Sequence, residues 1–129
     1  MPRTAARALV PLALGCMVAC THRSVRPPPP PVPAEVLRLV ATAYCQRGVT
    51  ASGARVRTGM VAADPRVLPL GTVLTILEPP SVGGTYTVAD TGSAIKGRKL
   101  DIYMPDCRRA VTFGRQRIVV RVVRRAAGE

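Results

Sequence analysis

Residues 85–104 read TYTVADTGSAIKGRKLDIYM, and this stretch predicts two β-strands joined by a loop. Threonine and tyrosine alternate with valine over residues 85–89, a period of two that is typical of a half-buried strand. Residues 90–97 are rich in turn-forming side chains, and residues 100–104 are again β-forming. Asp90 follows the first strand and Asp101 lies inside the second. Because aspartate is depleted in strands, Asp101 is either an outward-facing residue or part of a site.

Short β-forming runs continue on both sides of this stretch. We expect further strands over residues 36–44, 60–63, 72–78 and 117–124, separated by turns at residues 64–65 and 79–84. One short helix is expected to open at Pro105 and Asp106 and to run to about Phe113, where Gly114 ends it. Six short strands without room for βαβ units predict a mainly β fold, a small closed barrel with one or two short helices, since closure removes edge strands.

The length of 129 residues leaves room for one small domain and a targeting segment. Aromatic residues make up only 3%, which leaves few stacking platforms for single-stranded nucleic acid or for sugars. The single histidine, His22, precedes a proline run, and no CxxC or similar metal-ligand spacing occurs. We therefore expect neither histidine-dependent catalysis nor a metal or cofactor in the folded part.

The N-terminus has the pattern of an export signal. Arg3 and Arg7 precede an apolar run at residues 8–19 that is too short to cross a bilayer core of about 30 Å, so residues 1–19 are expected to be a signal peptide. The sequence MVAC at residues 17–20 resembles a bacterial lipobox and predicts lipidation at Cys20. Lipidation at Cys16 and ordinary signal cleavage remain alternatives.

The segment after Cys20 predicts a tether between a membrane and the folded domain. Residues 20–34 contain six prolines and lack apolar periodicity, which favours an extended polyproline II conformation. The folded domain is expected over residues 35–125, with a short tail at residues 126–129. These features place the chain in the cell envelope, at the outer membrane or in the periplasm if the cell has two membranes.

Charge and cysteine usage agree with export. The formal net charge of +12 reflects either drift toward arginine or attraction to a polyanion such as nucleic acid, an anionic membrane or a cell wall. An export signal argues against nucleic acid. Once Cys20 is set aside, Cys45 and Cys107 form an even pair in an oxidising compartment. We expect them to form a disulfide, with two separate buried thiols as the alternative.

Three aspartates are candidates for chemistry: Asp64, Asp90 and Asp101. Asp64 and Asp90 each precede turn residues and could simply accept hydrogen bonds from nearby backbone amides. The sequence VADTGS at residues 88–93 resembles the aspartic protease signature. That reaction needs two such aspartates from two lobes or a dimer, and the motif lies too late in this chain, so we disfavour it.

Ordered motifs across residues 40–123 carry a different resemblance. They are ATAY (41–44), TASG (50–53), VAADPRVLPLGT (61–72), TYTVADTG (85–92), AIKG (94–97), LDIYM (100–104) and FGR (113–115). Together they resemble the 3D domain of bacterial cell-wall proteins, which is named for three aspartates. That family is similar to the catalytic part of membrane-bound lytic transglycosylases of the A type and to expansins and rare lipoprotein A. The resemblance implies a six-stranded double-psi β-barrel.

The resemblance also implies an activity, namely non-hydrolytic cleavage of the β-1,4 bond between N-acetylmuramic acid and N-acetylglucosamine in peptidoglycan. Asp101 matches the family's proposed catalytic acid, and Asp90 and Asp64 match its supporting pair. Other motif residues are expected to bind substrate: Tyr44, Thr50, Ser52, Thr91, Lys96 and Tyr103. The expected partners are glycan strands and, through the lipid, a membrane, with the chain a monomer.

Two points bear on whether the chain is active. A free aspartate has a pKa of about 3.9, too low for an acid near neutral pH, and we expect the charges of Asp90 and Asp64 together with burial to raise the pKa of Asp101. Lys96 and Lys99 would oppose this shift or bind stem-peptide carboxylates. We expect no second domain of the kind with which the two-domain relative grips glycan, and aromatic residues are few, so a non-catalytic glycan-binding lipoprotein is the alternative function.

Overall fold

The computed structural model describes residues 33–127, and this part folds into six strands, one α-helix and a 3-10 turn. The elements are β1 (Val36–Tyr44), β2 (Met60–Ala63), β3 (Val73–Glu78), η1 (Pro80–Val82), β4 (Gly84–Asp90), β5 (Lys99–Tyr103), α1 (Cys107–Phe113) and β6 (Gln116–Arg124). All six expected strands are confirmed. The helix begins at Cys107, slightly later than expected, because Asp106 is its N-cap. The expected signal peptide, Cys20 and nearly all of the tether lie outside the described residues.

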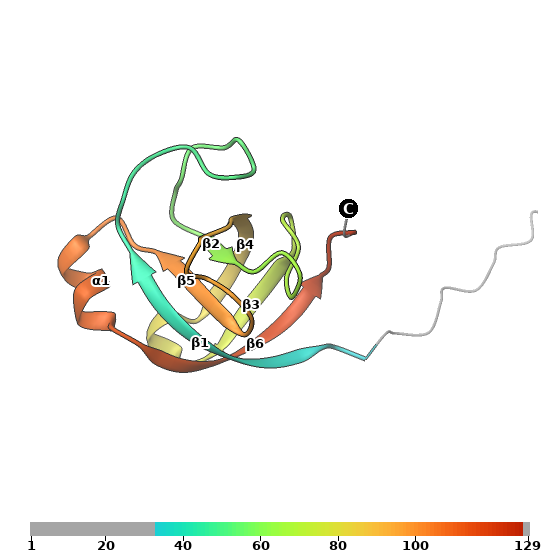
Figure 1. Cartoon of the computed structure of the whole chain (residues 1–129). Coiled ribbons are helices and arrows are strands. Elements are labelled where there is room, and N and C mark those ends of the chain that lie inside the picture. Colours follow the sequence, from blue (N-terminus) through green and yellow to red (C-terminus); the bar gives the residue numbers. More distant parts are fainter. Residues whose placement is uncertain (1–32, 128–129) are drawn as a thin grey trace, which may run out of the picture. The chain divides into compact units, whose positions relative to one another are not determined.

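The six strands close into a barrel in the order β1-β5-β2-β4-β3-β6 (Figure 1). β1 pairs with β5, and β2 with β4, in parallel, while the other four pairings are antiparallel. The predicted mainly β closed barrel is therefore confirmed. Closure joins the first strand to the last, so that every strand has two neighbours and no ladder edge is left open.

The barrel interior is aliphatic, and the strand alternation decides what faces outward. On β5, Leu100 and Ile102 belong to the buried core, so Asp101 between them faces the outside of the barrel. On β1, Leu39 and Ala41 are in the core. The alternation that fills the core thus also sets polar side chains of β1 and β5 on one outer surface.

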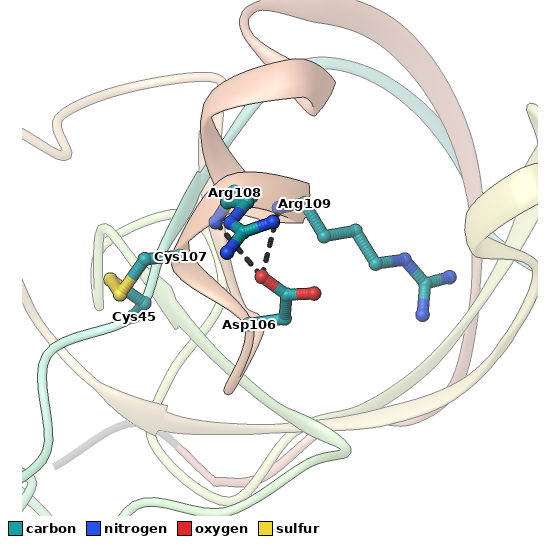
Figure 2. The surroundings of a disulfide bond; sticks show 5 residues. All are labelled: Cys45, Asp106, Cys107, Arg108 and Arg109. Atoms are coloured by element: carbon teal, nitrogen blue, oxygen red, sulfur yellow. Dashed lines mark hydrogen bonds between the residues drawn. A yellow bond between two sulfur atoms is a disulfide. The ribbon is translucent and has the colours of Figure 1, made fainter.

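A disulfide joins the end of β1 to the start of α1. The Cα atoms of Cys45 and Cys107 are 5.1 Å apart, and the bond confirms the expected pairing (Figure 2). Next to it, the Asp106 carboxylate accepts hydrogen bonds from the backbone amides of Arg108 (2.9 Å) and Arg109 (3.3 Å), which caps the helix. The loop at residues 45–59, which leaves β1 here and arches back to β2, is therefore held at its first residue.

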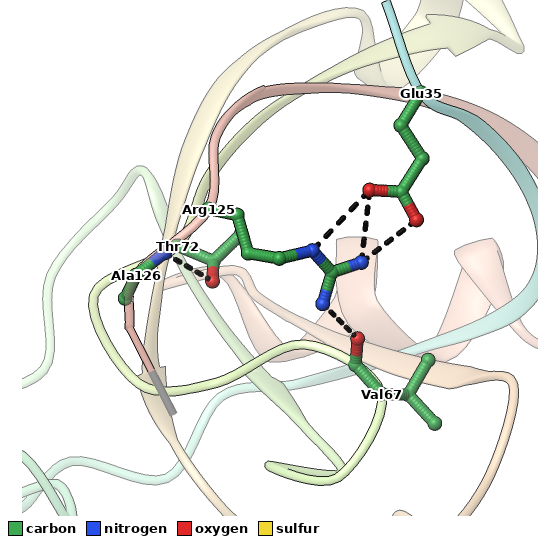
Figure 3. Close-up of polar contacts among 5 residues, drawn as sticks. All are labelled: Glu35, Val67, Thr72, Arg125 and Ala126. Carbon is green, nitrogen blue, oxygen red and sulfur yellow. Dashed lines mark hydrogen bonds and ion pairs between the residues drawn. The ribbon is translucent and has the colours of Figure 1, made fainter. Parts of the chain in front are cut away.

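A cluster of polar contacts ties the two ends of the barrel domain together. The Arg125 guanidinium lies 2.7 Å from the Glu35 carboxylate and donates a hydrogen bond of 2.8 Å to the carbonyl of Val67 (Figure 3). The backbone amide of Ala126 donates to the hydroxyl of Thr72 at 3.2 Å. These contacts bind the start of β1 and the end of β6 to the turn before β3. In residues 33–127 no helix is long and apolar enough to cross a membrane.

Candidate active site on the outer face of the barrel

Four residues on four neighbouring strands lie in one row across the barrel. Thr42 of β1 is paired with Asp101 of β5, Asp101 with Ala62 of β2, and Ala62 with Asp90 of β4. Because adjacent strands are about 4.8 Å apart, the two aspartates are separated by roughly 10 Å at the backbone. The strand position between them is Ala62, whose side chain is a single buried methyl group.

Asp101 is partly buried and hydrogen-bonded in this row. The Thr42 hydroxyl donates to its carboxylate at 2.8 Å. Burial raises the pKa of Asp101 above its ordinary value, and the hydrogen bond from Thr42 opposes that shift. The rise in pKa was expected, but the contribution expected from the charges of Asp90 and Asp64 is not found. Burial on the barrel wall, rather than like charge, is what favours the protonated form of Asp101.

Tyr44 lies close enough to both carboxylates of the row for their charges to act on it. Burial raises the pKa of Tyr44 to about 12, and the charges of Asp90 and Asp101 add to the shift. Its phenol is therefore a neutral hydrogen-bond donor across the physiological range. The hydroxyl is buried and has no hydrogen-bond partner within the described part of the chain. The ring packs edge-to-face on Tyr103, with ring centres 5.4 Å apart, and this contact fixes its orientation.

Asp90 anchors the loop at residues 45–59 beside this tyrosine. Its carboxylate accepts hydrogen bonds from the amides of Ala51 (2.9 Å) and Thr91 (2.8 Å). The hydroxyls of Thr50 and Ser52 lie 2.9 Å apart in the same loop. A small pocket of about 140 Å³ is lined by Tyr44, Gln46, Arg47, Gly48, Val49, Thr50, Val56 and Asp90. The structure thus brings most of the expected substrate-binding residues to the surroundings of Asp90 and Asp101.

Asp64 lies outside the row, and its carboxylate is fully engaged elsewhere. It accepts hydrogen bonds from the backbone amide and guanidinium of Arg66 and from the amide of Gly97 at 2.7 Å. The hydrogen bonds from the Arg66 side chain, followed by that from Gly97, hold the pKa of Asp64 well below its usual range. The expectation that Asp64 raises the pKa of Asp101 is wrong, whereas the expected turn hydrogen bond is present.

The bond from Asp64 to Gly97 positions the loop that carries Lys96. Gly97 has a φ of +68°, a conformation that side-chain-bearing residues rarely adopt, and this turn aims its amide at the buried carboxylate. Lys96 itself is exposed beside this anchor and makes no ion pair within residues 33–127. Asp64 therefore supports the neighbourhood of the site through the backbone rather than through charge.

Sequence reasoning missed Thr42, Ala62 and Arg66. The partner of Asp64 could have been predicted, because Arg66 follows it by two residues, a spacing that suits a turn-stabilising ion pair. Thr42 and Ala62 could not, because they meet Asp101 through pairings of strands that are distant in sequence. No group of three or more histidine, cysteine, aspartate or glutamate residues that could hold a metal occurs within residues 33–127.

Comparisons with known proteins agree with this arrangement. The profile of the 3D domain matches residues 59–124, so the chain belongs to the 3D-domain family. The cell wall-binding protein YocH of Bacillus subtilis is 35% identical over 96 residues, which cover 67% of this chain and 32% of YocH. The chain therefore spans about a third of the length of that relative.

Solved structures show the same fold. The crystal structure of E. coli MltA with bound chitohexaose superposes with a TM-score of 0.51 at 23% identity, covering 64% of this chain and 29% of MltA. A second crystal structure of MltA, described as a unique lytic transglycosylase fold, gives a TM-score of 0.50 at 24% identity over the same shares of the two chains. At this identity the likeness concerns the barrel fold.

Proposed function

We propose that this protein is a peptidoglycan lytic transglycosylase that cleaves the bond between N-acetylmuramic acid and N-acetylglucosamine. The observation that carries the proposal is Asp101, a partly buried strand carboxyl with a raised pKa, on an outer face shared with Tyr44 and Asp90. A raised pKa keeps more of the carboxyl protonated near neutral pH, as a general acid requires. Membership of the 3D-domain family supports the same assignment.

The chemistry needs only one carboxyl group. Asp101 donates its proton to the glycosidic oxygen, and the bond from that oxygen to the anomeric carbon of the muramyl residue breaks. The C6 hydroxyl of the same sugar then attacks the anomeric carbon and gives its proton to the Asp101 carboxylate. The products are a 1,6-anhydromuramyl end and a free N-acetylglucosamine 4-hydroxyl. Hydrolysis would instead need a second carboxylate to activate water or to attack the carbon.

In this proposal the residues around Asp101 bind the sugars. The unpartnered hydroxyl of Tyr44 donates to a substrate oxygen, because a buried hydroxyl without a partner gains most from a ligand that supplies an acceptor. Tyr103 is nearly buried and supports the Tyr44 ring, so it contributes to sugar binding mainly by orienting Tyr44. Polar contacts to the glycan come from Thr50, Ser52, Thr91 and Lys96. Asp90 and Asp64 are positioning residues that hold the loops carrying them.

A binding role without catalysis is the second candidate. It is favoured by the relative named as a cell wall-binding protein, and by the fact that a protein of this fold, MltA, has been solved with a bound chitohexaose. The chain has only three tyrosines and one phenylalanine to pack on sugars. In either role we place the protein in the cell envelope, anchored through a lipid on Cys20, a residue outside the described part.

Digestion of purified peptidoglycan, followed by mass spectrometry of the products, tests the proposal. Wild-type protein is expected to release 1,6-anhydromuramyl products. Asp101→Asn keeps the shape of the side chain but cannot donate and recover the proton, so its rate should fall by roughly 10²–10⁴-fold. Asp106→Asn is the matched control, because asparagine caps a helix about as well as aspartate and this residue lies outside the row.

Three outcomes separate the candidates. Anhydro products from wild type and the control, but not from Asp101→Asn, support the transglycosylase. Reducing-end muramic acid would mean hydrolysis and would contradict the single-carboxyl chemistry. Peptidoglycan binding without products in all three proteins would leave the binding role. Circular dichroism of Asp101→Asn shows whether a loss of activity reflects unfolding.

A further inference from the structure

A groove crosses the outside of the barrel next to the Asp101 row. It has a volume of about 510 Å³ and lies over β1 and β6. Its charged lining residues are three arginines, Arg38, Arg98 and Arg117, and one glutamate, Glu78. The groove is larger than the pocket of about 140 Å³ beside Asp90, and the proposed reaction does not use it.

The strand register produces an alternation of arginine and valine in this groove. Arg38 of β1 is paired with Val119 of β6, and Val40 of β1 with Arg117 of β6. Leu39 and Ile118 belong to the core, so these four side chains face outward. The two arginines therefore lie on one diagonal of this group of four and the two valines on the other, so that aliphatic carbon separates the two guanidinium groups.

The arginines of the groove have no carboxylate partner in the described part of the chain. The ion pairs within residues 33–127 are Arg66–Asp64 and Arg125–Glu35, and neither includes a groove residue. All three arginines are exposed, and Glu78 neutralises at most one of them. The groove therefore carries a net positive charge and free planar donors, which suit carboxylates in particular.

The groove lies a short distance along β1 from the proposed catalytic row. Val40 on its floor precedes Thr42 by two residues, or roughly 7 Å along β1. Val40 is also paired with Lys99, which precedes Asp101 by two residues on β5. A ligand that extends from Asp101 along β1 would thus pass Lys99 and then meet Arg117 and Arg38.

We infer that this groove binds the carboxylates of peptidoglycan stem peptides, so that the substrate is peptide-bearing rather than naked glycan. The inference rests on the proposed function and specifies its substrate class. Each muramyl residue carries its peptide on the lactyl group, so a strand cleaved at Asp101 brings an acidic peptide to within reach of the groove. Carboxylates would pair with the guanidinium groups, and the aliphatic parts of the peptide would pack on Val40 and Val119.

Binding of soluble muropeptides tests this inference independently of catalysis. The three ligands are the disaccharide with its tetrapeptide, the same compound with its carboxylates amidated, and the disaccharide alone. The proteins are wild type, Arg38→Gln/Arg117→Gln, and the control Arg108→Gln/Arg115→Gln, which removes the same charge from exposed arginines outside the groove. Calorimetry at low and at high salt gives the affinities.

Wild type should bind the peptide-bearing ligand about three- to tenfold more tightly than the other two ligands, as expected for two partly exposed charge pairs. That preference should weaken in high salt, vanish in the groove variant and persist in the control. Equal affinity of wild type for all three ligands would overturn the inference, as would an equal loss in the control variant.

Two further measurements keep this inference apart from its alternatives. Vesicles of phosphatidylglycerol and phosphatidylcholine test the groove as a membrane contact. If Arg38→Gln/Arg117→Gln loses vesicle binding but keeps the preference for the peptide-bearing ligand, the stem-peptide assignment is wrong. Digestion of peptide-free glycan strands separates the two proposals. Equal cleavage of naked and peptide-bearing strands would overturn this inference but keep the transglycosylase proposal. A preference for the peptide-bearing ligand in binding, without any cleavage, would keep this inference but overturn the transglycosylase proposal.

Discussion

At the scale of single residues, the two carboxyls Asp101 and Asp64 show how environment separates groups of one chemical type. Asp101 is partly buried with one hydroxyl donor, and burial raises its pKa. Asp64 is buried and accepts hydrogen bonds from the exposed Arg66 guanidinium and from the Gly97 amide, and its pKa falls well below the ordinary range. Burial favours the protonated form of Asp101, whereas the hydrogen bonds to Asp64 favour its charged form, so the family's three aspartates are not equivalent in this chain.

Thr42→Val should extend the activity to higher pH. The hydroxyl of Thr42 stabilises the charged form of Asp101, so its removal raises the pKa of Asp101 further. A general acid with a higher pKa stays protonated to higher pH, and the basic limb of the pH profile of kcat/KM should shift upward. Thr75→Val is the control, because Thr75 lies on β3 and its hydroxyl meets only that of Thr85, at 3.5 Å. An unchanged profile in Thr42→Val would contradict this role of the hydrogen bond.

Asp64→Asn should lower stability more at neutral pH than in acid. The pKa of Asp64 in the folded protein lies below its unfolded value, so its contribution to stability is present above about pH 4 and is lost as the pH falls toward the folded value. Urea unfolding followed by circular dichroism, which suits a chain without tryptophan, should show a gap between wild type and variant at pH 7 that begins to narrow below about pH 4 and keeps narrowing as the pH falls further. A gap of constant size would mean that the charge of Asp64 does not stabilise the fold. Activity should fall less than in Asp101→Asn.

At the scale of elements, the disulfide between β1 and α1 is expected to contribute strongly to stability. It closes a loop with a sequence separation of 62 residues, for which the chain-entropy model gives about 4 kcal/mol as an upper figure. Cys45→Ser/Cys107→Ser should therefore unfold at a clearly lower urea concentration than wild type. A reducing agent should lower the midpoint of wild type and leave that of the double variant unchanged. Peptide mapping without reduction that finds two alkylatable thiols at these positions would contradict the pairing.

Local pattern was enough to predict the elements themselves. The strand ends fell within one residue of their expected positions, because glycine, proline and aspartate mark the turns between short β-forming runs. The helix start was displaced because Asp106 caps the helix from outside instead of joining it. Local sequence pattern could not predict which strands are neighbours in the barrel. The contacts of Thr42 with Asp101, and the alternation of Arg38 and Arg117 with valines, depend on the pairings of β1 with β5 and β6.

At the scale of the whole molecule, the barrel is closed by its first and last strands. β1 carries Thr42 and Tyr44, and its two neighbours are β5, with Asp101, and β6. Loosening of the β1–β6 seam, the paired edge of the first and last strands, would therefore disturb the row that holds the proposed acid. The contacts of Arg125 with Glu35 and with the carbonyl of Val67 lie at the outer end of this seam (Figure 3).

A double-mutant cycle with Glu35→Gln and Arg125→Gln measures how much these end contacts stabilise the barrel. Both side chains are about two-fifths exposed, so their coupling energy should be small, about 0.2–1 kcal/mol, and should shrink in high salt. Arg125→Gln alone should cost more than Glu35→Gln, because it also removes the donor to the Val67 carbonyl. Arg124→Gln, one residue earlier and without an ion pair within residues 33–127, should have little effect. If Arg124→Gln destabilises as much as Arg125→Gln in urea unfolding, the seam is sensitive to net charge rather than to these contacts.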